Sequence, residues 1–245
     1  MTRVKLCGIT RLRDARLGAE LGAWAVGLIF HAESPRACPL GMAADIGAEL
    51  HREVALTGVF RNAPLDDVIR TAARARLSIL QLHGDEGPAY CAAAAQRTGC
   101  AIMKAARVRG GADVRGLAAF READFHLLDT HSTRLPGGTG ETFDWELVGR
   151  HRTGRVPLVL AGGLTPENVG EAIETVRPWG VDTASGTESR PGRKDQGRVR
   201  EFFAAVEAAS AAAEARPREV LEEQDTGRET LARPASSRSA ARLGG

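Results

Sequence analysis

The chain has 245 residues, of which 43% are hydrophobic and 4% aromatic, and its formal net charge is +2. This length fits one large domain or two small ones, with enough apolar residues for a core. A nucleic-acid binder would show a concentrated basic face or stacking aromatic side chains, and the sequence has neither. The expected partner is therefore a small molecule rather than nucleic acid.

The cysteines and the absence of apolar segments point to a cytoplasmic protein. No apolar run approaches the roughly 20 residues that cross a bilayer, so no membrane contact is expected. The start, MTRVKLCGIT, turns polar too early for a secretory signal. Cys7, Cys38, Cys91 and Cys100 show neither CxxC pairing nor zinc-like spacing, so we expect reduced thiols and no metal. We interpret the last three as core residues, and the sequence leaves both a monomer and a homodimer open.

Short apolar runs rich in β-branched residues recur along the chain and predict eight strands. The predicted strands are Val4–Cys7, Ala25–Phe30, Ala55–Phe60, Ile79–His83, Ala101–Ala105, Phe125–Asp129, Leu158–Ala161 and Val181–Ser185.

Helical patterns lie between these strands. After the third strand, Leu65, Val68 and Ala72 recur at helical spacing. After the seventh, Thr165 as a cap and Pro166 in the first helical position predict another helix. The last predicted helix covers Val199 to about Ala215.

Eight strands that alternate with helices favour parallel pairing through crossover connections. We predict a single α/β domain, a closed (β/α)8 TIM barrel over residues 1–215, because such barrels start near roughly 200 residues. The alternative is an open doubly wound sheet, which a GxGxxG fingerprint after the first strand would favour; Cys7-Gly8-Ile9-Thr10 is not one. Residues 216–245, rich in Arg, Glu, Ser and Ala, are expected to form a disordered tail.

Glycines follow the seventh and eighth predicted strands. In barrels of this kind active sites lie at the carboxyl ends of the strands, and phosphate often binds after strands seven and eight. Gly162-Gly163 and Ser185-Gly186 stand there. Backbone N–H groups beside glycine can approach an anion closely, so we predict a phosphate site, although either pair alone could simply make a tight turn.

A candidate acid and base also stand at strand ends. Cys7 ends the first predicted strand, and a thiol with a pKa of about 8.5 is partly ionised near neutral pH, more so beside a cation. Asp129 ends the sixth, and partial burial or a neighbouring anion would raise its pKa towards that of a general acid. The alternatives are a small buried hydrophobe for Cys7 and a helix cap for Asp129.

Three further polar residues have predicted places. Arg36, stiffened by the preceding Pro35, suits bidentate binding of a carboxylate, although it could be a solvated surface residue. His83 ends the fourth strand and is expected to contact substrate, although it could simply satisfy a hydrogen bond at the mouth of the barrel. Lys5 is expected in a polar layer inside the barrel rather than in catalysis.

Taken together, these segments resemble phosphoribosylanthranilate isomerase of tryptophan biosynthesis, in order from about residue 3 to 205. The matching strings are Val4-Lys5-Leu6-Cys7-Gly8-Ile9-Thr10, Gly27-Leu28-Ile29-Phe30, Ser34-Pro35-Arg36, Leu80-Gln81-Leu82-His83-Gly84, Leu127-Leu128-Asp129, Gly137-Gly138-Thr139-Gly140, Phe143-Asp144-Trp145, Leu160-Ala161-Gly162-Gly163-Leu164, Pro166-Glu167-Asn168-Val169, Val181-Asp182, Ser185-Gly186, Pro191-Gly192 and Lys194-Asp195.

The resemblance implies an Amadori rearrangement of a phosphorylated aminosugar, without metal or redox cofactor. It implies Asp129 as the general acid and Cys7 as the base. Arg36, His83 and Asp182 would bind the substrate, with Arg36 on the anthranilate carboxylate, and the two glycine loops would bind its phosphate.

The sequence departs from the family pattern at three places. His31-Ala32-Glu33 stands where an aromatic and a lysine are common, Ala184 where serine is usual, and Glu141 where lysine is common. These departures concern substrate affinity more than reaction type. The glycine-rich segment Thr130–Gly140 fits either a lid or an ordinary loop.

Two other functions remain as alternatives. One is another phosphosugar barrel enzyme, such as a synthase, an aldolase or an epimerase, which would need catalytic lysines and glutamates or a His/Asp metal cluster. The other is a non-catalytic metabolite-binding barrel, which would be expected to lack the acid or the base. A barrel that also serves histidine biosynthesis would carry an aspartate in place of Cys7.

Overall fold

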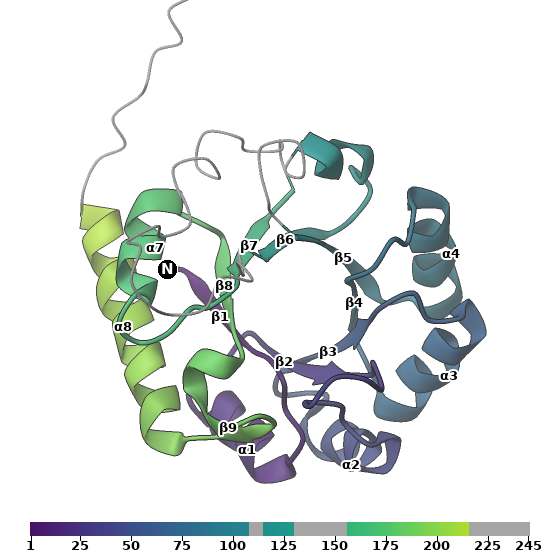
Figure 1. Ribbon diagram of the computed structural model, residues 1–245, viewed down its shortest axis with the longest axis horizontal. Coiled ribbons are helices and arrows are strands. Elements are labelled where there is room, and N and C mark those ends of the chain that lie inside the picture. The colour runs from purple at the N-terminus through teal and green to yellow at the C-terminus, as the bar shows by residue number, and fades with distance from the viewer. Residues whose placement is uncertain (108–114, 130–155, 216–245) are drawn as a thin grey trace, which may run out of the picture.

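The structure is a computed structural model, and it describes residues 1–107, 115–129 and 156–215. Its centre is a closed barrel of eight parallel strands in chain order, with the last strand paired to the first (Figure 1). The predicted tail, the predicted lid segment Thr130–Gly140 and the departure at Glu141 lie outside the described residues.

All eight predicted strands are confirmed, with ends that differ by at most two residues. They are β1 (Arg3–Leu6), β2 (Ala25–Ile29), β3 (Ala55–Phe60), β4 (Ile79–Leu82), β5 (Ala101–Arg107), β6 (Phe125–Asp129), β7 (Leu158–Ala161) and β8 (Gly180–Thr183).

Helices surround the barrel (Figure 1). The described ones are α1 (Leu12–Glu20), α2 (Leu40–Leu50), α3 (Leu65–Ala75), α4 (Pro88–Thr98), α7 (Val169–Val176) and α8 (Gln196–Ala215), with a single 3₁₀ turn, η1 (Leu117–Ala119), between β5 and β6.

Two helix starts differ from the prediction. Helix α7 begins at Val169 and not at Pro166, because the Asn168 amide holds residues 165–168 in a turn: Oδ1 accepts from Thr165 N at 2.8 Å and Nδ2 donates to Gly163 O at 3.0 Å. Helix α8 begins three residues before Val199, where Asp195 Oδ1 accepts from the backbone N–H of Arg198 at 3.1 Å, as a capping residue does.

A short antiparallel hairpin follows β8 and was not predicted. The 3₁₀ turn η2 (Ser185–Thr187) leads into β9 (Glu188–Arg190) and β10 (Arg193–Lys194). Gly192 makes the tight turn with φ of 74°, a left-handed conformation that glycine adopts without strain. Two-residue and three-residue strands are too short to leave a periodic signal in the sequence.

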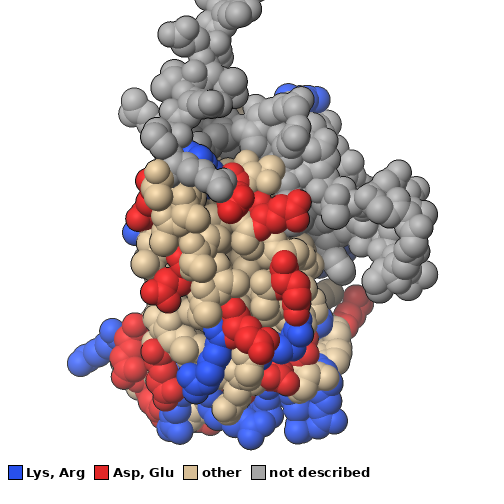
Figure 2. Space-filling view, turned by 90° about the vertical axis from the view of Figure 1, so that its left-hand side faces the viewer, with Lys and Arg blue, Asp and Glu red and all other residues tan. Residues whose placement is uncertain are grey.

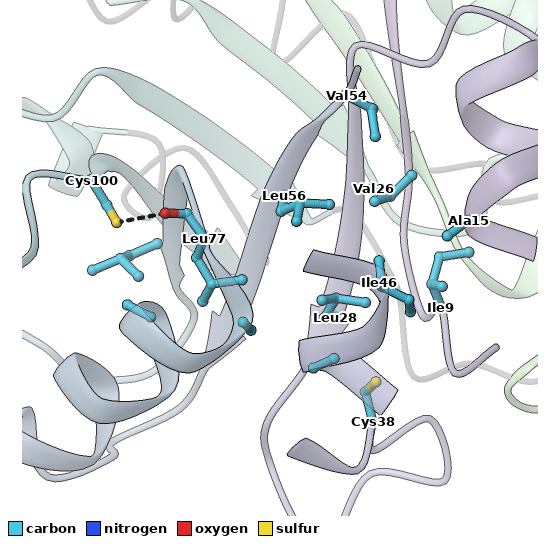
Figure 3. Close-up of a cluster of buried hydrophobic side chains, with 14 of the residues drawn as sticks. Ile9, Ala15, Val26, Leu28, Cys38, Ile46, Val54, Leu56, Leu77 and Cys100 are labelled. Carbon is cyan, nitrogen blue, oxygen red and sulfur yellow. Dashed lines mark hydrogen bonds between the residues drawn. The ribbon is translucent and has the colours of Figure 1, made fainter. Parts of the chain in front are cut away.

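The main core lies between the strands and the surrounding helices. Figure 3 shows side chains of β2 and β3 packed against those of α1 and α2, among them Val26, Leu28, Ala15 and Ile46. Each such fully buried aliphatic side chain contributes roughly 1.5–3 kcal/mol. Cys100 lies at the edge of this cluster with Sγ 3.2 Å from Leu77 O.

The inside of the barrel is divided into an apolar and a polar part. Strands β4 to β7 contribute the apolar part, which consists of Ile79, Met103, Ala105, Leu127, Val159 and Ala161. The polar part contains Lys5 and Asp182, which are 0% and 7% exposed. Lys5 therefore lies in the polar interior, as predicted.

Acidic and basic side chains are interspersed on the face drawn in Figure 2, with the basic ones gathered towards its lower end. The guanidinium of Arg190 is the main reason that the pKa of its neighbour Arg193 is lowered.

In the described part of the chain, no helix is long and apolar enough to span a membrane. Within the same residues, no three His, Cys, Asp or Glu side chains are grouped as a metal site requires.

Candidate active site

A pocket of about 280 Å³ lies at the carboxyl ends of the barrel strands. It brings together eight of the nine residues predicted for the site: Cys7, Arg36, His83, Asp129, Gly162, Gly163, Asp182 and Ser185. The ninth, Gly186, adjoins Ser185 in η2. Side chains and loops from six segments far apart in sequence therefore meet in one pocket.

Cys7 reaches the pocket because its neighbour on β2 has no side chain. A Cβ atom on Gly27 would lie 2.6 Å from Cys7 Sγ, closer than such atoms approach one another. The backbone N–H of Cys7 donates to Thr183 O at 2.8 Å and joins the residue to the end of β8. The thiol is thus fixed between β2 and β8, with 6% of the residue exposed.

The pKa of the Cys7 thiol is raised, because burial disfavours the thiolate more than Lys5 favours it. A cation beside Cys7 was expected to favour the thiolate, and Lys5 and Lys194 both act in that direction. Burial therefore acts against the easily ionised thiol that the sequence predicts. The sequence could not give the degree of burial that decides the sign.

Lys5 and Asp182 form an ion pair beneath Cys7. Lys5 Nζ lies 2.7 Å from Asp182 Oδ2. Burial alone would lower the pKa of Lys5, but Asp182 and Cys7 outweigh it and the pKa is raised. Lys5 is therefore a permanent cation two residues before Cys7 on the same face of β1. Burial raises the pKa of Asp182, against the opposing effect of Lys5.

Asp129 and His83 lie next to each other in the wall of the pocket. His83 Nε2 lies 3.4 Å from Asp129 Oδ2, and His83 Nδ1 lies 3.3 Å from the amide nitrogen of Gln81. In the wall of this pocket, Gln81 Oε1 and Asp182 Oδ1 are buried without a hydrogen-bond partner in the described part of the chain. Buried polar atoms of this kind are normally satisfied by a ligand or solvent, so the polar wall of the pocket suits a polar ligand.

The two glycine loops pack against each other. Gly162 and Gly163 have φ of 98° and 65°, which other residues adopt only with strain. A Cβ atom on Gly186 would lie 1.9 Å from Leu164 O, so the loop after β8 touches the backbone of the loop after β7. Thr183 Oγ1 also donates to Leu164 O at 2.9 Å. The loops form one surface on which backbone N–H groups can meet an anion.

Arg36 does not extend into solvent. Its Nε and Nη2 atoms lie 2.8–3.0 Å from the carboxylate of Glu188, whose side chain is only 3% exposed. Arg36 itself lines the pocket with 23% of its side chain exposed. The reading of Arg36 as a solvated surface arginine is therefore wrong.

The sequence analysis assigned no role to three residues that organise the site. Glu188 binds Arg36, and Lys194 donates to Ala184 O at 2.7 Å beside the glycine loop after β8. Glu86, the third, holds the loop after β4: it accepts from Gly84 N at 2.8 Å and lies 3.1 Å from Lys104. Lys194 stands within a string that carried the family resemblance, which was the available signal. Glu188 is 152 residues from Arg36, and Glu86 is 18 residues from Lys104, so neither ion pair is visible in the sequence.

A closed (β/α)8 barrel with a candidate acid, a candidate base and paired glycine loops at its carboxyl end is the architecture of a phosphosugar-metabolising enzyme. The family model of N-(5'-phosphoribosyl)anthranilate (PRA) isomerase matches residues 4–205. The chain belongs to the N-(5'-phosphoribosyl)anthranilate isomerase family.

Individual relatives agree with the family model. The isomerase of Geobacter metallireducens is 46% identical over 203 residues, which are 83% of this chain and 98% of the relative. That of Geobacter sulfurreducens is 48% identical over 203 residues, with 83% and 97% covered. The crystal structure of the Thermotoga maritima isomerase superposes with a TM-score of 0.78 at 40% identity, with 85% of this chain and 100% of that one covered.

A further solved isomerase holds reduced 1-(o-carboxyphenylamino)-1-deoxyribulose 5-phosphate. It is 38% identical, with a TM-score of 0.76, and the match covers 85% of this chain and 100% of that one.

Proposed function

We propose that this chain converts N-(5'-phosphoribosyl)anthranilate to 1-(o-carboxyphenylamino)-1-deoxyribulose 5-phosphate in tryptophan biosynthesis, with Asp129 as general acid and Cys7 as general base. The observation that carries the assignment is the single pocket that contains both residues together with Arg36 and the glycine loops. We also infer a cytoplasmic location, since all four cysteines are free thiols.

The first step opens the sugar ring. Asp129 gives its proton to the ring oxygen, the bond between that oxygen and C1 breaks, and the anilino nitrogen lone pair forms the C1–N double bond of a Schiff base. His83, 3.4 Å from Asp129, is placed to contact the released hydroxyl or the acid itself. The Schiff base then acidifies the proton on C2.

The second step moves that proton. The Cys7 thiolate removes it, and the electron pair forms the C1–C2 double bond of an enolamine while the nitrogen becomes neutral. Protonation at C1 and loss of the hydroxyl proton then give the ketone at C2, so atoms and charge balance. Lys5 favours the thiolate from below, against the effect of burial.

The substrate is anionic at both ends, and the pocket has a candidate contact for each. Arg36 offers a guanidinium for the anthranilate carboxylate. Gly162, Gly163, Ser185 and Gly186 offer backbone N–H groups for the phosphate. Asp182, buried beside Lys5, contributes its unpartnered Oδ1 to the polar floor on which the sugar hydroxyls would lie.

The test is a fluorescence assay of substrate consumption, with the substrate made in situ, on the wild type beside Cys7→Ser and Asp129→Asn. Removing a general acid or base commonly costs about a hundredfold to ten-thousandfold in rate. Cys91→Ala, in a buried part of α4, and Asp45→Asn, on the exposed side of α2, are the matched controls and should retain activity. No turnover by the folded wild type would contradict the proposed reaction; full activity in either site variant would contradict its assigned role.

A further inference from the structure

We propose that Glu188 is the residue that positions Arg36 for recognition of the anthranilate carboxylate, and that the β9–β10 hairpin serves to hold Glu188 in place. The inference rests on the proposed function, because it takes Arg36 as the carboxylate-binding group. It assigns a specificity-determining role to a residue outside the acid, the base and the phosphate loops.

The geometry of the pair leaves one edge of Arg36 for a ligand. A guanidinium presents two edges that can bind a carboxylate bidentately, one formed by Nε and Nη2 and the other by Nη1 and Nη2. Glu188 occupies the first, with Nε at 3.0 and 2.9 Å from its two oxygens and Nη2 at 2.8 Å from Oε2. Nη1 has no hydrogen-bond partner in residues 1–107, 115–129 and 156–215, so the second edge is available for a carboxylate.

The hairpin fixes Glu188 from its other side. The backbone N–H of Gly192 in the hairpin turn donates to Glu188 Oε1 at 3.2 Å. Lys194 Nζ lies 3.7 Å from the same oxygen. With its charge balanced by Arg36 and Lys194 and 3% of its side chain exposed, the carboxylate is a fixed group rather than a surface charge.

The segment that carries the base is shaped around the pair. A Cβ atom on Gly8 would lie 2.9 Å from Arg36 Cδ and 3.3 Å from Glu188 Oε1. Thr10, two residues later, donates from Oγ1 to Gly192 O in the hairpin turn. Gly8 thus leaves the space in which Arg36 and Glu188 meet, and Thr10 joins the same turn to the end of β1.

The pair therefore fixes the distance between the carboxylate contact and the base. Arg36 reaches the pocket from the loop after β2, a long side chain that would otherwise sample many rotamers. Holding one edge against Glu188 leaves the other in a single orientation relative to Cys7. A displacement of about 1 Å at such a contact can cost on the order of a hundredfold in rate.

The experiment compares the affinities of two ligands for the full chain. One is reduced 1-(o-carboxyphenylamino)-1-deoxyribulose 5-phosphate and the other is the same compound without the carboxyl group, both titrated by calorimetry. Glu188→Gln keeps the size of the side chain but presents an amide NH₂ to the guanidinium, where two donors oppose each other. We expect Glu188→Gln to lower the affinity for the carboxylated ligand by about tenfold to a hundredfold. The affinity for the other ligand should stay within about twofold of the wild-type value.

Arg36→Met provides the second arm. If Glu188 acts through Arg36, Glu188→Gln has little further effect in the Arg36→Met background. Glu49→Gln is the matched control, since Glu49 pairs with Arg16 between α1 and α2 on the surface in the same bidentate way. It should change neither affinity.

The outcomes separate the two proposals. The positioning role would be overturned by any of three results: equal losses of affinity for both ligands in Glu188→Gln, an unchanged preference for the carboxylated ligand, or losses that add to those of Arg36→Met. Binding and turnover by the wild type would still support the proposed function in these cases. A folded wild type that binds neither ligand would overturn the proposed function and this inference with it.

Discussion

Inside the barrel, the ammonium of Lys5 lies 2.7 Å from Oδ2 of Asp182, and their Cα atoms are register partners on β1 and β8. The pair lies one strand repeat below Cys7, because side chains two residues apart on a strand share a face. A buried cation held in this way opposes the rise that burial causes in the pKa of the thiol above it, without itself contacting solvent. The buried polar pair inside the barrel therefore influences the pKa of Cys7 in the pocket above it.

Replacing the cation should leave less of Cys7 in the thiolate form. In Lys5→Met the opposing effect of Lys5 is lost while burial remains, so the pKa of Cys7 rises further and less thiolate is present at any given pH. The acidic limb of the pH profile of kcat/KM should move to higher pH, with about a tenfold or greater loss of rate near neutral pH. The measurement is that profile, together with the pH dependence of Cys7 alkylation by iodoacetamide located by mass spectrometry.

The double variant Lys5→Met/Asp182→Asn tests the electrostatic explanation. Asp182 raises the pKa of Cys7 whereas Lys5 lowers it, so removing both charges should shift the profile less than removing Lys5 alone. A Lys5→Met profile that keeps the wild-type limb, or moves it to lower pH, would contradict the role assigned to Lys5.

Gly27→Ala should displace the base. The added methyl group would lie 2.6 Å from Cys7 Sγ and 3.1 Å from Cys7 Cα, so either the thiol or the end of β1 has to move. We expect kcat to fall by about tenfold to a hundredfold. In the matched control Gly41→Ala, the new methyl group on α2 meets nothing within 4 Å, and the free energy of unfolding should stay the same or rise by up to about 1 kcal/mol. Unchanged kcat in Gly27→Ala would show that the thiol does not need this position.

Gly186→Ala should weaken the phosphate contact. Its methyl group would lie 1.9 Å from Leu164 O, which forces the two glycine loops apart. If the loops act as one anion-binding surface, as we propose, KM should rise more than kcat falls, and inorganic phosphate should inhibit less strongly as a competitor. Steady-state kinetics with a phosphate titration give both values, and Gly41→Ala again serves as the control. A fall in kcat with unchanged KM and unchanged inhibition by phosphate would contradict the assignment of the phosphate to these two loops.

The strands and the pocket could be predicted because their signals are local. Each strand is a short apolar run that ends at a glycine or a polar residue, and a barrel brings such ends to one face. The pair of Arg36 and Glu188 could not be predicted, because 152 residues separate the partners and the hairpin that joins them is too short to leave a pattern. The direction of the Cys7 pKa shift was missed for a related reason: burial by β2 and β8 is a tertiary property, whereas the neighbouring Lys5 is visible in the sequence.

The last prediction concerns stability and depends on Lys194. Burial is the main reason that the pKa of Lys194 is lowered from 10.5 to about 8, and Arg36 adds a smaller effect in the same direction. Glu188, Cys7 and Asp182 act in the opposite direction. Between these two values the unfolded chain holds a proton that the folded chain has released. The free energy of unfolding contributed by this group therefore rises with pH through that window and is constant below it.

Urea unfolding of the wild type and of Lys194→Met at pH 7 and pH 9.5 measures this contribution. Between these two pH values, the free energy of unfolding of the wild type should increase by about 2 kcal/mol more than that of the variant. Both measurements are repeated in the Cys7→Ser background, because Cys7 is one of the groups that raise the pKa of Lys194. The same increase in the wild type and in Lys194→Met, in both backgrounds, would mean that Lys194 keeps its ordinary pKa despite its burial beside the loop after β8.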